Sequence, residues 1–377
     1  MASSTTTIAK NETWIALLGR RDTPVDGVED YCTFLGGALS TCGITLNQVR
    51  VDWWCFGWAH ALRQLARESV SWRGSWVLLQ FTALAWSRRG FPFGALAVLR
   101  ILRKQGARVA VVFHEPFRQT ANPTRFNRIR GNCQDWVVRK LFEGADRAVF
   151  ADPLDTIPWL PVEHSKAAFI PIGANIPERL SVAGSPTSRT GSTRTIAVFC
   201  LSDLPNRQNE LSDISHALKS VALNGAKIRL VFLGRGTAEA KEEIDRAFAG
   251  IPAEVLNLGL LPAADVSGTL SDSDVMLCVR GLLFPRRGSA IAGIACGLPI
   301  IAYAGASEGT PLLEAGIELV PYRDAAALAS SLSRILTDDN HWQALRERSI
   351  LAHRKYFSWD VIAASFCNFL NPTRPSA

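Results

Sequence analysis

Short apolar runs alternate with segments of helical periodicity along almost the whole chain. The run WVLLQF (Trp76–Phe81) carries no charge, and RVAVVFHE (Arg108–Glu115) is apolar from Val109 to Phe113. Such uniformly apolar strands are typical of sheets buried on both faces, and strands that alternate with helices form parallel βαβ units. The pattern therefore predicts an α/β fold built on parallel sheets.

The alternation is interrupted once, by LSVAGSPTSRTGSTRT (180–195), which lacks aromatic residues and is rich in Ser, Thr, Gly and Pro. This composition is typical of a linker. We therefore predict a polar disordered tail at 1–13, a first domain at 14–179, a linker at 180–194 and a second domain that begins at 195. A length of 377 residues suits two domains. Ligands in such sheets bind at the carboxyl ends of the strands, in a cleft.

Strands are expected at 14–19, 76–81, 108–115, 147–152 and 167–176 in the first half, and at 195–201, 228–236, 254–261, 274–281 and 299–305 in the second. Helices are expected at 27–43, 93–106, 210–224, 238–249 and 288–296.

The eight cysteines are scattered and form no CxxC pair, which argues against a disulfide framework or a zinc site and favours a reducing compartment. No signal peptide is recognisable. The longest uncharged apolar run, 74–87, falls short of the roughly 20 residues that a spanning helix needs. A cytoplasmic protein is expected.

The net charge of +7 lies entirely in residues 1–175, which hold 21 Lys and Arg against 14 Asp and Glu. Between Glu68 and Glu115 there are seven basic residues and no acidic one, and six tryptophans lie between Trp53 and Trp86. This combination suits an anionic membrane surface or an anionic lipid-linked partner. The alternative is that the tryptophans form core and the arginines a solvated face. No nucleic-acid recognition motif is present.

Several segments, taken in order, resemble the GT-B glycosyltransferases of the family 4 type. They are FHEP (113–116), FIPIGANIP (169–177), LVFLGRG (230–236), LSDSDVMLCV (270–279), AGIACGLPIIAY (292–303) and KYFSWDVIAASF (355–366). The resemblance covers nearly the whole chain. It implies two Rossmann-like parallel-sheet domains facing a central cleft: an acceptor domain at 14–179 and a nucleotide-sugar donor domain at 195–354. A helix within 355–377 would cross back onto the first domain.

The chain departs from the family at the donor loop. Two glutamates separated by seven residues are usual there, but alignment on Ala295-Cys296-Gly297 gives Phe284 and Ala292 at those positions. The basic residue expected after the first donor-domain strand is also displaced, and Arg207 is the nearest candidate.

The stretch Arg286-Arg287-Gly288-Ser289 is the candidate diphosphate site. Gly288 and Ser289 open a predicted helix whose first N–H groups face an anion, and guanidinium groups bind diphosphates bidentately. Arg280, at the end of its strand, would join this cluster. The alternative is a basic surface turn capped by Ser289.

Three further groups are candidates. Gly234, Arg235 and Gly236 lie between a strand and a helix, where glycines let a nucleotide approach the backbone. His114 and Glu115 end a strand, where His114 would contact the sugar or accept a proton and Glu115 would orient it or act separately. Asp26, Gly27 and Glu29 precede or open a helix, either to contact an acceptor or simply to cap the helix. Asp272-Ser273-Asp274 is interpreted as a turn, so no metal or other cofactor is expected.

The leading hypothesis is a metal-independent, retaining glycosyltransferase of a bacterial cell envelope or polysaccharide pathway. It would use a UDP- or GDP-sugar and a glycan or lipid-linked acceptor, at the inner face of the cytoplasmic membrane. The main alternative is a catalytically silent GT-B domain that binds a glycan or partner, which the missing glutamates favour. A UDP-sugar epimerase would need several acid–base residues where this chain has small ones.

Overall fold

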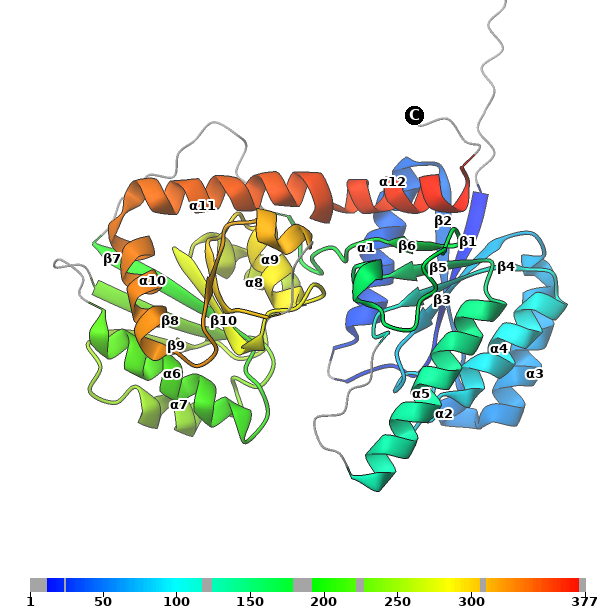
Figure 1. Ribbon diagram of the computed structural model, residues 1–377, viewed down its shortest axis with the longest axis horizontal. Coiled ribbons are helices and arrows are strands. Elements are labelled where there is room, and N and C mark those ends of the chain that lie inside the picture. The colour runs from blue at the N-terminus through cyan, green and yellow to red at the C-terminus, as the bar shows by residue number, and fades with distance from the viewer. Residues whose placement is uncertain are drawn as a thin grey trace, which may run out of the picture. The chain divides into compact units, whose positions relative to one another are not determined.

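A computed structural model describes residues 12–23, 25–116, 124–178, 192–221, 227–305 and 310–372. The chain divides into two compact units, the first made of Met1–Pro171 with Trp359–Ala377 and the second of Ile172–Ser358. Each unit contains one six-stranded sheet, and its paired strands run parallel (Figure 1). The predicted α/β class with two parallel sheets is therefore confirmed.

The first unit has the strand order β2-β1-β3-β4-β5-β6. Its strands are β1 (Glu12–Leu18), β2 (Ile44–Arg50), β3 (Trp76–Phe81), β4 (Arg108–Phe113), β5 (Arg147–Phe150) and β6 (Ala167–Phe169). Its helices are α1 (Gly27–Thr41), α2 (Trp53–Phe56), α3 (Trp58–Glu68), α4 (Phe93–Lys104), α5 (Arg125–Gly144) and α12 (Trp359–Leu370), with short 3₁₀ turns at Ser69–Trp72 and Leu154–Thr156.

Helix α12 comes from the end of the chain and packs beside α1 (Figure 1). The Trp359 ring stacks on Phe34 at a centroid distance of 5.7 Å and meets the edge of Tyr31 at 5.3 Å. An aromatic pair of this kind stabilises by about 0.5–1.5 kcal/mol beyond the area it buries, so these contacts help to hold the C-terminal helix on this unit.

The second unit has the strand order β12-β11-β10-β7-β8-β9. Its strands are β7 (Thr193–Phe199), β8 (Lys227–Leu233), β9 (Ala253–Asn257), β10 (Val275–Leu282), β11 (Ile300–Tyr303) and β12 (Ile317–Val320). Its helices are α6 (Asn206–Ser220), α7 (Lys241–Ala247), α8 (Ala263–Ser271), α9 (Gly288–Ala295), α10 (Ala325–Thr337) and α11 (Asp339–Ala352), with a 3₁₀ turn at Pro311–Glu314 and a π-helical turn at His353–Phe357.

The structure moves several predicted boundaries. β1 begins at Glu12, inside the predicted tail, and β7 begins at Thr193, inside the predicted linker. Residues 1–11 and 179–191 lie outside the described part of the chain. The units divide after Pro171, because Ala174 and Ile176 pack into the core of the second unit. Eight elements have no counterpart among the predicted ones: helices α2, α3, α5, α8, α10 and α11 and strands β2 and β12.

The tryptophans of the first half are divided between core and surface. Trp53, Trp76 and Trp86 are buried, whereas Trp54 is exposed and lies beneath the guanidinium groups of Arg20 and Arg88. Core packing therefore explains half of the six tryptophans that had suggested a membrane-facing surface.

Candidate functional site

A bulge in β10 positions Arg280. β10 pairs with β11 through Cys278 and Ala302, but its next paired residue is Leu282, opposite Tyr303, so residues 279–281 leave the ladder. Gly281 adopts a φ of 71°, a conformation that glycine reaches without steric cost. Bulges of this kind turn a side chain out of a strand. Arg280 lines a polar cavity of about 130 Å³.

Arg287 lies at the N-terminus of α9, directly after that strand. It is the N-cap residue, and its side chain is only 7% exposed. Nη2 donates to the Leu282 carbonyl at 2.9 Å, and Nε has no hydrogen-bond partner among the described residues. The first turn of a helix also presents unsatisfied N–H groups. A buried cation and a helix N-terminus therefore coincide here, and both favour an anion.

Phe284 supports both arginines of the loop. Its ring centroid is 4.0 Å from the Arg287 guanidinium carbon and 5.1 Å from that of Arg286. Phe284 occupies one of the two positions where the family usually has glutamate, so an aromatic face takes the place of an anion. Ala292, at the other position, is buried in α9.

Arg280, Arg286 and Arg287 together form what we call the arginine cluster. Burial lowers the pKa of Arg287, and the charges of Arg280 and Arg286 lower it further, against opposite effects from Cys278 and Glu210. Arginine nevertheless stays protonated. The structure thus brings together Arg280, Arg286, Arg287, Gly288 and Ser289 as the sequence predicted, at a point of concentrated positive charge. The Ser289 hydroxyl lies 3.8 Å from the Cys278 sulfur.

The predicted nucleotide turn Gly234-Arg235-Gly236 packs on the loop after β7. Both glycines have positive φ, of 90° and 83°. A Cβ on Gly234 would lie 2.7 Å from the Phe199 ring, and one on Gly236 would lie 2.8 Å from the Leu201 carbonyl oxygen. Close backbone packing alone therefore requires these glycines, and nucleotide binding is not needed to explain them. Arg235 is exposed.

Arg207 has structural contacts in this unit. Its side chain is largely buried in α6, where Nη1 donates to the Gly236 carbonyl at 3.3 Å and Nε lies 3.3 Å from Glu243 of α7. These contacts join the Gly234–Gly236 turn to α6 and α7. They assign Arg207 a role in fixing the turn, whereas the sequence had suggested diphosphate binding.

His114 in the first unit is oriented by Gln80. Its Nε2 lies 2.8 Å from Gln80 Oε1, and its ring meets the edge of Tyr31 at 5.0 Å. The Gln80 amide is oriented by the bond of 3.3 Å that its Nε2 donates to the Leu78 carbonyl. Since the amide oxygen that faces His114 can only accept, Nε2 of His114 carries the proton and Nδ1 is the acceptor. This arrangement suits a proton acceptor.

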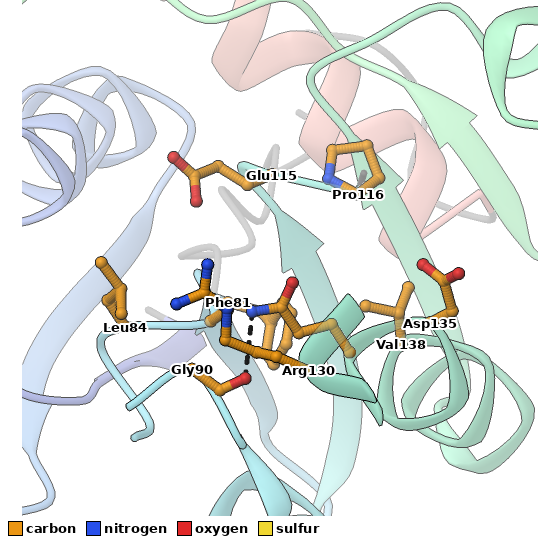
Figure 2. Close-up of a pocket in the computed structure, with 10 residues that line it drawn as sticks. Phe81, Leu84, Gly90, Glu115, Pro116, Arg130, Asp135 and Val138 are labelled. Atoms are coloured by element: carbon orange, nitrogen blue, oxygen red, sulfur yellow. Dashed lines mark hydrogen bonds between the residues drawn. The ribbon is translucent and has the colours of Figure 1, made fainter. Parts of the chain in front are cut away.

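Glu115 lines a cavity of about 210 Å³. Figure 2 shows Glu115 and Pro116 on one side of the cavity and Gly90 and Arg130 on the other. A dashed line in the same view marks the bond of 3.0 Å that Gln134 Nε2 donates to the Gly90 carbonyl.

The predicted acceptor residues form a helix cap. Asp26 Oδ1 accepts from the N–H groups of Val28 and Glu29, which caps α1. Arg50 Nη2, from the end of β2, lies 3.5 Å from Asp26 and 3.2 Å from Glu29. Gly27 is the first residue of α1. Of the two roles that the sequence left open, the contacts support capping.

The N-terminal half of α5 has an exposed apolar stripe. Phe126, Ile129 and Trp136 recur at helical spacing and are about half exposed, and Phe93 of α4 meets Trp136 at a centroid distance of 6.1 Å. We call these four residues the α5 face. Helices α4 and α5 lie side by side in the first unit (Figure 1). Along 125–140 there are five basic residues and one acidic residue, Asp135.

Neither a cluster of metal-ligating side chains nor a membrane-spanning helix occurs in the part of the chain that the structure describes. In that part of the chain no three His, Cys, Asp or Glu side chains are grouped so that they could hold a metal ion. None of the helices there is both long and apolar enough to cross a membrane.

Two buried residues of these sites had not been singled out in the sequence, Gln80 on β3 and Glu210 on α6. Gln80 is the one polar residue inside WVLLQF, and that interruption of an apolar strand was a usable signal. Glu210 gives no such signal, because it stands in a polar helical segment, NRQNELSD, like any surface glutamate.

Known proteins resemble this chain in the sequence of the second unit and in the fold. Residues 195–338 match the family model described as "Glycosyl transferases group 1". No curated protein matches the chain in sequence.

Three solved structures resemble it over its length. They are sucrose-phosphate synthase from Thermosynechococcus elongatus (17% identity, TM-score 0.68, 96% of this chain and 98% of that one), a glycosyltransferase from Rickettsia africae (12%, 0.66, 96% and 100%) and HepE of Anabaena in complex with UDP-glucose (12%, 0.64, 96% and 99%). This chain therefore has the GT-B fold, and its residues 195–338 match the sequence model of the group 1 glycosyl transferases.

Proposed function

We propose that this chain transfers a sugar from a nucleoside diphosphate sugar to a glycan or lipid-linked acceptor, without a metal ion and with retention of anomeric configuration. The observation that carries the proposal is the arginine cluster at the N-terminus of α9, at the carboxyl end of β10. HepE, which has the same fold, is described in complex with UDP-glucose. The family resemblance supports retention.

In the proposed reaction the bond between the anomeric carbon and the β-phosphate oxygen breaks, and its electron pair leaves with the diphosphate. Arg280, Arg286 and Arg287 and the first N–H groups of α9 would stabilise that charge, as a metal ion does in other enzymes. The acceptor oxygen forms the new bond and releases its proton. His114, with Nδ1 as the acceptor nitrogen, is our candidate to receive that proton.

The experiment that tests this function uses a panel of UDP- and GDP-sugars with EDTA present. We expect one donor to raise the Tm of the protein and to be hydrolysed slowly. NMR should show that the released sugar keeps the anomeric configuration of the donor. Donor binding without hydrolysis or transfer would instead favour a silent binding protein, the alternative that Phe284 and Ala292 in place of glutamates support. If no donor binds, the transferase proposal fails.

We further propose that the α5 face docks on an anionic membrane, which suits a lipid-linked acceptor. Half-exposed aromatic and aliphatic side chains would enter the interface, while the arginines around them attract acidic headgroups. Each basic residue near such a surface contributes about 1 kcal/mol, and salt screens this attraction.

Ile129→Glu should reduce binding to vesicles of phosphatidylcholine and phosphatidylglycerol about tenfold or more. Burial of one large apolar side chain stabilises by about 1.5–3 kcal/mol, and the new carboxylate is repelled by the lipid charge. Co-sedimentation measures the effect. Val162→Glu is the matched control, since Val162 is 95% exposed in the same unit and lies outside the α5 face. Equal loss in both variants, or no binding of the unaltered protein, would contradict the docking surface.

A further inference from the structure

Glu210 is a buried carboxylate that uses one of its two oxygens for a hydrogen bond within the described part of the chain. Its residue is only 4% exposed on α6. Oε2 accepts from the Ser202 N–H at 3.1 Å, whereas Oε1 is buried and has no hydrogen-bond partner among the described residues. Leaving a buried charged oxygen unpaired is costly, so such a group in a folded protein is expected to have a partner that the polypeptide does not supply.

Glu210 lines the polar cavity of about 130 Å³ that Arg280 also lines. The charges of Arg280 and Arg287 act on it, so this carboxylate faces the arginine cluster. The cavity walls are rich in hydrogen-bonding groups; they include Ser202, Asn206, Asn209, Tyr303 and Tyr322. Such a lining suits a ligand that carries several hydroxyl groups.

Asp213, one helical turn beyond Glu210 and also in the cavity wall, differs in having its partners within the protein. It accepts from the Tyr303 hydroxyl at 2.7 Å and from Arg323 Nε at 3.3 Å. Arg323 has a φ of 60°, a strained conformation for a residue other than glycine. Asp213 therefore fixes the wall of the cavity, and Glu210 is the carboxylate left for a ligand.

We propose that Glu210 Oε1 accepts a hydrogen bond from a hydroxyl of a sugar ring of the donor, in a subsite beside the arginine cluster. This inference rests on the proposed function and adds the residue that binds the ring. The cavity is smaller than the roughly 300–1,000 Å³ typical of sites for whole drug-sized ligands, so it suits one ring. The ring is either the transferred sugar or the ribose of the nucleotide.

The test compares Glu210→Gln with the unaltered protein. Glutamine keeps an oxygen for the Ser202 N–H but replaces the second oxygen by an amide donor. Calorimetry measures the affinity of each protein for three kinds of ligand. They are the nucleotide sugars UDP-glucose, UDP-galactose, UDP-N-acetylglucosamine and GDP-mannose, the diphosphates UDP and GDP, and 2′-deoxy-UDP. Glu242→Gln, an exposed change on α7, is the control. Affinity for the bound nucleotide sugar should fall about 10- to 100-fold in Glu210→Gln only.

The ligands distinguish the two rings. If Glu210→Gln loses affinity for the nucleotide sugar but not for its diphosphate, Glu210 binds the transferred sugar. If Glu210→Gln loses affinity for both, and the unaltered protein binds 2′-deoxy-UDP more weakly than UDP, Glu210 binds the ribose. If the unaltered protein binds a donor and Glu210→Gln binds every ligand equally well, the subsite is refuted while the proposed function stands. If the unaltered protein binds no donor, both fail.

The stability of the ligand-free protein gives a second readout. Burial raises the pKa of Glu210, against opposing effects of Ser202, Arg280 and Arg287. The pKa of this carboxyl is therefore higher in the folded protein than its ordinary value of 4.5, which applies in the unfolded chain. As the pH rises above 4.5, the carboxyl therefore destabilises the folded state increasingly. The Tm of Glu210→Gln should therefore equal or exceed that of the unaltered protein at pH 7, and the difference should shrink toward pH 4.5. A lower Tm at pH 7 with unchanged ligand affinity would indicate a purely structural glutamate and overturn the proposal.

Discussion

Replacing Arg287 by alanine should lower the rate of sugar transfer or donor hydrolysis by about 10²–10³-fold. This is the usual cost of removing one preorganised group that stabilises charge in the transition state. Arg287 is well placed for the role, because its guanidinium is buried at the start of α9 and held over Phe284. Arg287→Lys should recover only part of the rate, since lysine keeps the charge but not the bidentate geometry.

Folding of the Arg287→Ala variant separates this role from a structural one. The residue stands beside two like charges, Arg280 and Arg286, so its loss relieves repulsion that offsets the lost bond to the Leu282 carbonyl. We expect a Tm close to that of the unaltered protein and no stabilisation by donor. Arg229→Ala, which removes an exposed arginine of the same unit, is the control. Full activity in Arg287→Ala would rule out the arginine cluster as the diphosphate site.

Replacing His114 by phenylalanine should lower kcat by about 10²–10⁴-fold, the range that general acid–base groups contribute. Phenylalanine keeps a ring against Tyr31 but offers no nitrogen to accept a proton. Donor affinity should stay unchanged, because the proposed donor contacts all lie in the second unit. Steady-state kinetics and calorimetry with the same donor measure the two quantities.

The control for this change is His164→Phe, a partly exposed histidine in the same unit whose Nδ1 lies 2.9 Å from the Pro161 carbonyl. Gln80→Leu should give an intermediate loss of kcat, since it removes the group that sets the His114 tautomer. If His114→Phe keeps full kcat, the proton acceptor must be sought elsewhere. If it loses donor affinity instead, His114 binds the donor.

The sequence predicted the sheets better than the surroundings of single residues. Strand β3 and the core of β4 are continuous apolar runs, and burial on both faces of a parallel sheet demands that pattern. Helix α5 escaped recognition because its exposed apolar stripe and its arginines blur the contrast between faces. For the tryptophans the sequence left a surface role and a core role open, since composition carries no information on burial; Trp53, Trp76 and Trp86 are core.

By itself, then, the sequence determined the parallel α/β architecture and the placement of Arg286 and Arg287 at the start of a helix, because both depend on residues close together in the chain. Only the tertiary structure decided that Arg207 contacts the Gly234–Gly236 turn and that Gln80 orients His114. It also decided that one oxygen of Glu210, in the cavity that Arg280 lines, has no hydrogen-bond partner among the residues described. These facts depend on contacts between strands and helices far apart in sequence. Burial and hydrogen-bond partners are settled by such contacts, and no local pattern encodes them.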